Sequence, residues 1–289
     1  MRQYLDALRT ILDSGIDRPN RTGVPSRAVV AVPLRFKMAE GFPAVTTKQL
    51  YWKKVAAELL FFLKGSQDIH ELQGLGGDGL WEGDAFSPKW APKANFPGDM
   101  GRVYGVQWRR WRKFTEPVFD SDGELTKQSE TKSIDQIANL IQTIRENPND
   151  RRMIVSAWNP GELDQMCLPP CHAFFQCFMF NDRLTLVMYQ RSCDMFLGEP
   201  FNIASYAMLL HMLAQVTDTI PDELVIILGD AHIYHNHFEA VAELLKREPL
   251  PLPKLWLNPE VKDIDNFKME DIKLMNYKHH PPIKAKLNT

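Results

Sequence analysis

Cys171 is the residue best placed for covalent chemistry. It follows two prolines and begins an alternating stretch that predicts a strand, and the Asn181-Asp182 turn pairs this strand with the next one, 183–190, as a hairpin. Counting back from the turn, with Phe180 opposite Arg183, places Cys171 opposite Ser192 and next to Arg191. A slip of one residue or a bulge would change this register but would still leave Arg191 close to Cys171. A nearby guanidinium favours the thiolate, the nucleophilic form of cysteine. We therefore expect Cys171 to act as a nucleophile, although most single buried cysteines are structural.

Four arginines lie at turns or strand ends beside polar residues: Arg21, Arg151, Arg152 and Arg191. Several guanidinium groups around one site suit a phosphate dianion, because each forms bidentate charge-assisted hydrogen bonds. The sequence contains no glycine-rich loop of the nucleoside-triphosphate type. We therefore expect a monophosphate held by side chains, with a solvated strand edge as the alternative for the Arg151-Arg152 pair.

Asn202 has the side chain needed to recognise a pyrimidine. Its carboxamide both donates and accepts hydrogen bonds, which matches N3–H and O4 of uracil. A carboxylate at this position would instead favour the amino group of cytosine. The structural alternative is that Asn202 is the N-cap of the following helix, a position that asparagine prefers.

Glu58 and three tryptophans are further candidates. Glu58 lies in an otherwise apolar helix, 53–64, where a buried unpaired carboxylate is costly, so it either faces a wet site or lies at a solvated helix edge. The segment 74–101 has no sustained periodicity, and loops of this length are usually functional or disordered. Trp81, Trp90 and Trp108 favour an ordered aromatic wall that stacks on a flat ligand, with core packing as the alternative.

These residues require strands and long helices to position them. We expect helices at 4–12, 53–64, from Ser133 (with Gln136 completing a capping box) to Asn147-Pro148, 203–216 and 236–246. We expect strands at 28–36, 153–158, 171–180, 183–190 and 223–228, with a polar surface insertion at 117–132. The pattern predicts one domain, 1–289, of mixed α/β (α+β type) architecture in which helices pack on a mixed sheet.

Composition excludes several classes of protein. Hydrophobic residues make up 44% and charged residues 24%, as in ordinary globular proteins, and the net charge of −2 argues against binding nucleic acid by bulk charge. The sequence has no uninterrupted apolar stretch of membrane-spanning length, and its N-terminus reads as an amphipathic helix instead of a signal peptide. The four cysteines lack paired zinc-site spacing. We expect a cytoplasmic protein with free thiols and no metal.

Longer motifs match a known family in order along nearly the whole chain. They are NRTG (20–23), FPAVTTK (42–48), VYGVQWR (103–109), DRRMIVSAWNP (150–160), LPPCHAFFQ (168–176), YQRSCD (189–194), PFNIASY (200–206), LGDAHIYHNH (228–237), REPLPLPKL (247–255) and HPPIKA (280–285). Together these blocks resemble thymidylate synthase. The resemblance implies that family's fold, with a homodimer formed through the sheet.

The resemblance also implies roles for individual residues. Cys171 matches the nucleophile that adds to C6 of dUMP, and the catalytic set is Cys171, Glu58, Tyr104, His172 and Arg191. The dUMP-binding set is Arg21, Arg151, Arg152, Gln190, Arg191, Ser192, Cys193, Asp194, Asn202, His232 and Tyr234. The folate-binding set is Lys48, Tyr51, Trp81, Asp194, Leu197, Gly198, Phe201 and Asn288. Within the dUMP set, Arg151 and Arg152 match the arginines that the other subunit donates, and His232 and Tyr234 match the groups that hold the ribose hydroxyl.

The implied reaction is methylene transfer from 5,10-methylenetetrahydrofolate to C5 of dUMP, followed by hydride transfer from the same folate. The folate is then both carbon donor and reductant, so neither a metal nor a nicotinamide is required. A dCMP-directed enzyme is disfavoured because position 202 is Asn. A non-catalytic nucleotide- or RNA-binding relative would need the fold without the intact set of site residues that this sequence retains.

Several residues depart from the family pattern on the folate side. Glu82 stands where Asp is usual, Arg102 where proline is usual, Tyr51 where histidine is common, and Glu199 at an apolar position. The tail 286–289 is polar where the family has a small apolar end. These departures keep open a sister activity, dUMP hydroxymethylase, in which water captures the methylene intermediate. Glu199 could orient that water, or it could simply face solvent.

Overall fold

The structure, a computed structural model, describes residues 1–288. Its helices are α1 (Arg2–Ser14), α2 (Trp52–Lys64), α3 (Ile69–Gly74), α4 (Glu82–Ala85), α5 (Tyr104–Arg109), α6 (Gln136–Glu146), α7 (Glu199–Val216) and α8 (Phe238–Leu245). Its strands are β1 (Ile16–Arg18), β2 (Ser26–Lys37), β3 (Trp111–Thr115), β4 (Val118–Phe119), β5 (Leu125–Lys127), β6 (Glu130–Ile134), β7 (Ile154–Ser156), β8 (His172–Phe180), β9 (Arg183–Gln190), β10 (Cys193–Asp194), β11 (Ile220–Tyr234), β12 (Lys254–Leu257) and β13 (Ile272–Met275).

A mixed sheet forms the centre of the described chain. Its strand order is β1-β2-β11-β9-β8-β7, with β10 beside the end of β11. The pairs β11–β9 and β10–β11 are parallel and the other pairs are antiparallel. The prediction of a mixed sheet packed by helices is confirmed.

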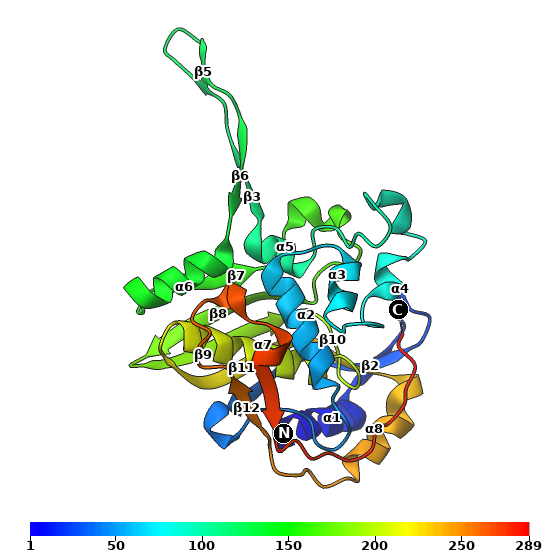
Figure 1. The fold of residues 1–289 in the computed structure, drawn as a ribbon. Helices are drawn as coiled ribbons and strands as arrows, with labels where there is room; N and C mark the ends of the chain where they lie inside the picture. The colour runs from blue at the N-terminus through cyan, green and yellow to red at the C-terminus, as the bar shows by residue number, and fades with distance from the viewer. Residues whose placement is uncertain (289) are drawn as a thin grey trace.

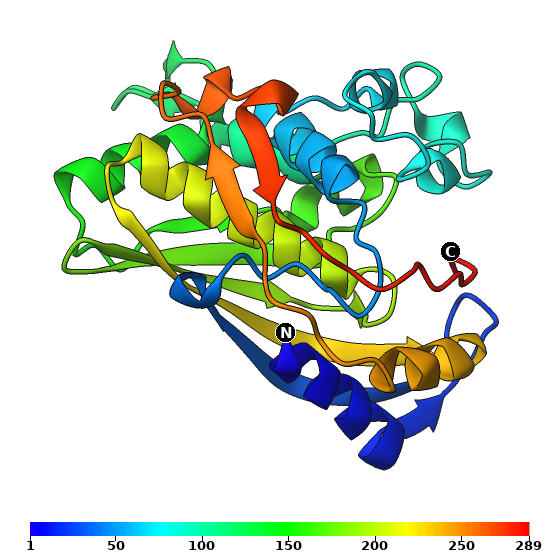
Figure 2. The same ribbon diagram turned by 60° about the horizontal axis from the view of Figure 1, so that its bottom comes forward.

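Helix α7 lies on the sheet, and α2 packs above it (Figures 1 and 2). Helix α7 is buried on nearly all sides because its residues are apolar all round, as expected of a central helix. Helix α5 contacts α2 closely at Gly105, where an added Cβ would lie 2.2 Å from the carbonyl oxygen of Phe62. This close approach holds Tyr104 beside the helix that carries Glu58. No helix in residues 1–288 is long and apolar enough to cross a membrane.

The hairpin β8–β9 has the expected turn but a different register at its far end. Asn181 adopts a positive φ of 58°, and Phe180 pairs with Arg183 as predicted. A bulge between His172 and Phe174 then shifts the pairing by one residue. Cys171 consequently lies opposite Arg191, whose backbone N–H donates to the Cys171 carbonyl at 2.8 Å, and the predicted pairing with Ser192 is wrong.

The predicted start of the next helix is wrong, whereas the predicted surface insertion is present. Helix α6 begins after Asp135, whose carboxylate accepts the backbone N–H of Ala138 at 2.9 Å, whereas Ser133 lies in strand β6. Asp135 competes successfully as N-cap because Ser133 is already paired with Arg112 in the β3–β6 ladder. The polar insertion is exposed, as expected, but it forms a two-stranded arm that projects from the body of the protein (Figure 1).

Candidate active site

Cys171 lies at the mouth of the hairpin, immediately before β8. The guanidinium of Arg191 donates to the carbonyls of Pro169 and Pro170, each at 2.8 Å, and its Nη2 lies 4.0 Å from Cys171 Sγ. The Cys171 backbone N–H donates to the Tyr104 hydroxyl at 2.7 Å. The Pro-Pro turn therefore positions both the thiol and the cation that faces it.

Burial raises the pKa of the Cys171 thiol, and this effect exceeds the opposing effects of Arg191 and Arg21, which favour the thiolate. The expectation that the guanidinium stabilises the thiolate is right in direction. It is not the dominant influence, because most of the thiol is removed from water. The arginines hold the pKa of Cys171 below the value that burial alone would give.

Glu58 faces the same site from α2. Its carboxylate accepts the indole N–H of Trp81 at 2.7 Å, and burial raises the pKa of Glu58 to about 7. A carboxyl group that titrates near neutral pH is suited to general acid–base catalysis. Beside it, burial lowers the pKa of His172 to about 4, so its imidazole is neutral at pH 7.

Asn202 lies within the first turns of α7. The helix begins at Glu199 with Gly198 as its N-cap, so the alternative that Asn202 is the N-cap is wrong. The Asn202 side chain lines the cavity next to Cys171, where its carboxamide can both donate to and accept from a ligand.

His232 and Tyr234 lie at the end of β11. His232 Nδ1 is 3.2 Å from Asp230 Oδ1, and the rings of His232 and Tyr234 are 5.0 Å apart. Burial lowers the pKa of His232 and raises that of Tyr234. Asp194, on the neighbouring β10, accepts the backbone N–H groups of the turn that leads into α7. This turn connects the two strand ends to Asn202.

These elements enclose a cavity of about 260 Å³. Residues of the predicted site that line it are Arg21, Glu58, Trp81, Tyr104, Cys171, His172, Gln190, Ser192, Asp194, Gly198, Asn202, His232, Tyr234 and Asn288. The tail reaches the cavity through Leu287 and Asn288, and Asn288 also exchanges hydrogen bonds with the Asn236 side chain at 3.0 and 3.1 Å. Thr289, the last residue of the predicted polar tail, lies outside the described residues.

A second cavity, of about 360 Å³, contains the remaining folate-side candidates in its walls: Lys48, Tyr51, Leu197 and Phe201. Residues 282–285 of the C-terminal segment complete this wall. Lys48 is mostly buried, with Nζ donating to the carbonyl oxygen of Phe196 at 2.5 Å, and burial lowers its pKa to about 8. The Lys48 ammonium therefore points into the protein, whereas Tyr51 is half exposed.

Four predicted residues line neither cavity. Arg191 lies behind Cys171 on the Pro169-Pro170 carbonyls, and Cys193 is buried with its thiol against Glu199. Arg151 and Arg152 are exposed, and Arg152 pairs with Asp150 at 3.0 Å. Within this single chain neither arginine lines the cavity that contains Cys171.

Two of the three tryptophans do not belong to the site. Trp90 is buried and donates its indole N–H to the Asp99 carbonyl at 2.6 Å, and Trp108 packs edge-on against Phe175 in the core. Of the three tryptophans, only Trp81 lines the cavity that contains Cys171, together with Tyr104 and His172, whose rings are 5.1 Å apart.

Sequence reasoning missed five residues of the cavity wall: Phe62, Leu80, Asp84, Leu168 and Leu287. Asp84 is the most informative, because it places a further carboxyl group in the cavity that contains Cys171. Burial raises the pKa of Asp84 and the nearby Arg21 opposes this. Its position on α4, three residues after Trp81, is the sequence signal that would have identified it.

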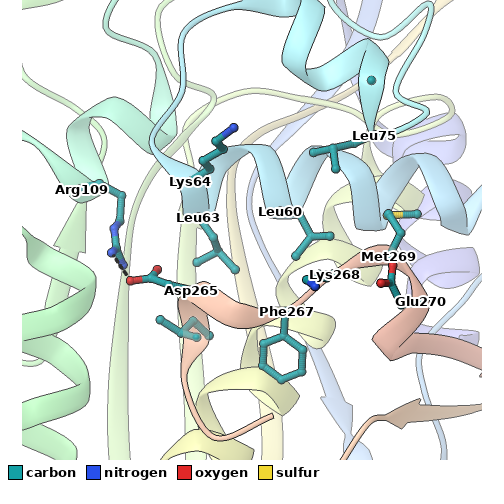
Figure 3. Close-up of a pocket in the computed structure, with 12 residues that line it drawn as sticks. Leu60, Leu63, Lys64, Leu75, Arg109, Asp265, Phe267, Lys268, Met269 and Glu270 are labelled. Carbon is teal, nitrogen blue, oxygen red and sulfur yellow. Dashed lines mark hydrogen bonds and ion pairs between the residues drawn. The ribbon is translucent and has the colours of Figure 1, made fainter.

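A larger cavity, of about 790 Å³, lies elsewhere, between α2, the end of α5 and residues 264–270 (Figure 3). Leu60, Leu63 and Phe267 form its apolar part, and Arg109 pairs with Asp265 at 2.7 Å on its edge. No cysteine or histidine lines it. Cavity size is therefore a poorer guide to the chemistry of this protein than the residues around Cys171.

Comparison with known families agrees with this geometry. The thymidylate synthase family model matches residues 2–289. The chain therefore belongs to the thymidylate synthase family. Membership implies an enzyme of the methyltransferase type that uses dUMP and a reduced folate.

Proposed function

We propose that this protein is a thymidylate synthase that converts dUMP to dTMP with 5,10-methylenetetrahydrofolate as carbon and hydride donor. One observation carries the proposal: a single cavity combines the Cys171 thiol, with Arg191 4.0 Å from its sulfur, and Glu58, with a pKa of about 7. Asn202 supplies the amide that reads a pyrimidine in the same cavity.

In the proposed reaction Cys171 Sγ adds to C6 of the uracil ring and makes C5 nucleophilic. Glu58 and Tyr104 move protons at C5 and O4, while neutral His172 helps to organise polar contacts around O4. Arg21 and Ser192 bind the phosphate from the cavity wall, and Arg191 would turn from the Pro169 and Pro170 carbonyls to join them. His232 with Tyr234 holds the ribose hydroxyl. The remaining substrate-side candidates, Gln190, Cys193 and Asp194, support this arrangement from β9 and β10.

The second cavity suits the flat and partly apolar body of a folate. Leu197 and Phe201 supply apolar surface there, next to Gly198 and Trp81 of the first cavity. The folate supplies the one-carbon unit and the hydride when bound. The residues of the chain orient it and exclude water, with Asn288 and Leu287 of the tail at the cavity wall.

We also propose a homodimer formed through the sheet. The face of the sheet opposite α7 presents apolar side chains, among which Phe174 and Tyr189 stack at 5.8 Å and remain more than a third exposed. A second copy on this face would cover them. It would also give Arg151 and Arg152 a role in the partner's phosphate site that they do not have within one chain.

The four cysteines of the chain are free thiols. Free thiols suit a reducing compartment, so we propose that the enzyme acts in the cytoplasm.

A second activity, hydroxymethylation of dUMP, is favoured by one feature of the cavity. Asp84 and Asn288 place polar groups in the wall of the cavity that contains Cys171, where a captured water could be held. Glu199 does not favour this activity in the way expected from sequence: it is fully buried and lines neither cavity. The alternative that Glu199 faces solvent is also wrong, because its side chain is fully buried.

Product analysis separates the two activities. The enzyme is incubated with dUMP and methylenetetrahydrofolate, and both products are identified by mass spectrometry. dTMP with dihydrofolate supports the synthase, and hydroxymethyl-dUMP with tetrahydrofolate would establish the alternative. A folate-dependent covalent adduct of 5-fluoro-dUMP, absent in Cys171→Ala, tests the nucleophile. Without an adduct, a non-catalytic relative would be indicated.

A further inference from the structure

Asp230 lies between His232, at the wall of the active-site cavity, and Arg18, on the surface. Its Oδ1 is 3.2 Å from Nδ1 of His232, and its Oδ2 forms an ion pair with the guanidinium of Arg18. Asp230 and His232 are two residues apart on β11, so their side chains lie on the same face of the sheet. Arg18 belongs to β1, which β2 separates from β11. The two oxygens of one carboxylate therefore have two different partners.

The backbone of Asp230 is tied to the strand end next to Cys171. Its N–H donates to the Arg191 carbonyl at 3.2 Å, and the Arg191 N–H donates to the Cys171 carbonyl at 2.8 Å. The side chain of Asp230 is 26% exposed and that of His232 is 11% exposed. The contact between them is thus partly shielded from water, which strengthens a hydrogen bond to a charged group.

The carboxylate decides which nitrogen of His232 carries the proton. The Arg18 guanidinium favours the ionised form of Asp230, and an ionised carboxylate only accepts hydrogen bonds. Nδ1 of His232, which faces this carboxylate, must therefore be an N–H. Burial lowers the pKa of His232, so its imidazole is neutral at pH 7 and has a single N–H. Nε2 is then left as an acceptor on a residue that lines the cavity.

An acceptor at Nε2 suits a ligand group that donates. The only free sugar hydroxyl of dUMP is at the 3′ position, and a hydroxyl donates one hydrogen bond while accepting others. Tyr234, whose ring is 5.0 Å from that of His232, can donate to it in return, because burial raises the pKa of Tyr234 and keeps its hydroxyl protonated. A 3′ substituent that only accepts would leave Nε2 without a partner.

We infer that Asp230, anchored by Arg18, is a positioning residue that holds the proton of His232 on Nδ1, and thereby makes the site select nucleotides whose 3′ group donates a hydrogen bond. The inference rests on the proposed function, since it assumes that dUMP occupies this cavity with its sugar at His232. Asp230 itself does not line the cavity and acts only through His232.

The test replaces Asp230 with asparagine in the full-length enzyme. Arg18 can only donate, so the asparagine oxygen should turn to it and the amide NH₂ should face Nδ1. Nδ1 must then accept, and the proton of His232 moves to Nε2. Dissociation constants are measured for dUMP and for its analogue with fluorine in place of the 3′ hydroxyl, which cannot donate. We expect the preference for dUMP over the fluoro analogue to fall about fivefold in Asp230→Asn, as for one lost hydrogen bond.

Asp222→Asn is the matched control. Asp222 lies on the same strand and pairs with Arg183 at 3.2 Å, but it does not line the cavity that contains Cys171. Its replacement should leave the preference for dUMP unchanged. A purely structural role of Asp230 predicts a lower melting temperature in Asp230→Asn and equally weakened binding of both nucleotides. That result, with dUMP still bound by the wild type, would overturn the inference and leave the proposed function intact.

Nitrogen NMR of isotope-labelled histidine side chains gives a second readout, which the wild type alone supplies. His232→Gln identifies the His232 signals by their loss. We expect a protonated Nδ1 and an unprotonated Nε2 in the wild type, and the reverse in Asp230→Asn. A neutral His232 with its proton on Nε2 in the wild type would overturn the inference. A wild-type enzyme that binds neither nucleotide would overturn the proposed function as well.

Discussion

At the scale of single residues, burial dominates the electrostatics of this site. It raises the pKa of the Cys171 thiol against the effect of two arginines, brings that of Glu58 to about 7 and lowers that of His172 to about 4. Each shift has a different chemical consequence, because burial disfavours whichever form of the group is charged. At pH 7 the His172 imidazole is therefore neutral and Glu58 is close to the midpoint of its titration, with Arg21 and Arg191 as cations near Cys171.

Trp81→Phe tests the pKa of Glu58. The indole N–H stabilises the ionised carboxylate, so its loss should raise the pKa of Glu58 above about 7. The limb of the pH–rate profile that requires ionised Glu58 should then move up by about one pH unit. Trp90→Phe is the matched control, because its indole bonds to Asp99 away from the site. A limb that stays in place in Trp81→Phe would contradict this assignment.

Glu199→Gln tests the cost of a buried acid. Burial raises the pKa of Glu199 from 4.5 to about 8, so the native state keeps its proton in a pH range where the unfolded state has lost it. This difference lowers the free energy of unfolding as the pH rises from about 4.5 to about 8. Glutamine does not titrate, so its advantage over the wild type should grow across that window, reaching on the order of 4 kcal/mol.

Urea unfolding at pH 5 and pH 8 measures this difference. The titratable groups near Glu199 are Cys193, Asp194 and Tyr4, which are common to both proteins. Their contribution therefore largely cancels in the comparison. If Glu199→Gln exceeds the wild type in free energy of unfolding by the same amount at both pH values, Glu199 does not titrate between them.

At the scale of elements, residues that depart from the family pattern have structural partners. Glu82 accepts the backbone N–H groups of Gly79 and Trp81, at 2.7 and 3.1 Å, and so fixes the start of α4. Arg102 donates to the buried carboxylate of Glu162 at 2.6 Å. Neither residue lines the two cavities around the site, so these departures concern the support of the site and not its chemistry.

Shortening the projecting arm tests whether it contributes to the body of the enzyme. Thr115 and Glu130 are paired across β3 and β6, so residues 116–129 can be replaced by Asn-Gly, a tight hairpin turn. The strands of the arm beyond this pair are exposed. We expect kcat/KM to stay within about twofold and the melting temperature within about 2 °C, as for other surface changes. A loss of activity in the shortened protein would show that the arm contributes to catalysis or to substrate binding.

At the scale of the whole molecule, the proposed dimer makes each site depend on two chains. Arg151→Ala and Cys171→Ala should each be inactive as homodimers, the first because it lacks a partner arginine and the second because it lacks the nucleophile. In an equal mixture, half of the dimers are mixed and each of these has one complete site, so activity should recover to about a quarter of the wild type.

The mixture needs a control for exchange between subunits. Two variants that both lack the nucleophile, Cys171→Ala and Cys171→Ser, should give no recovery when mixed. Sedimentation of Tyr189→Glu, which puts a charge on the apolar sheet face, should show dissociation to monomers. Failure of the first pair to recover activity, in a protein that still exchanges subunits, would place Arg151 outside the partner's site.

The sequence by itself determined the local structure and the kinds of chemistry. The alternating strands, the Asn181-Asp182 turn and the helix around Glu58 follow from periodicity and turn residues, which depend on near neighbours. The choice of Cys171 and Asn202 follows from the chemistry of their side chains. The family motifs added the expected substrate, the reduced folate and the roles of the individual residues.

Only the tertiary structure decided how these groups meet. The bulge before Phe174 placed Cys171 opposite Arg191, and the start of α7 at Glu199 put Asn202 inside the helix. Packing likewise placed the indole N–H of Trp81 on Glu58 in the site and that of Trp90 on the Asp99 carbonyl, and enclosed Glu199 against Cys193. Register and burial depend on packing between segments distant in the sequence, so no local pattern specifies them.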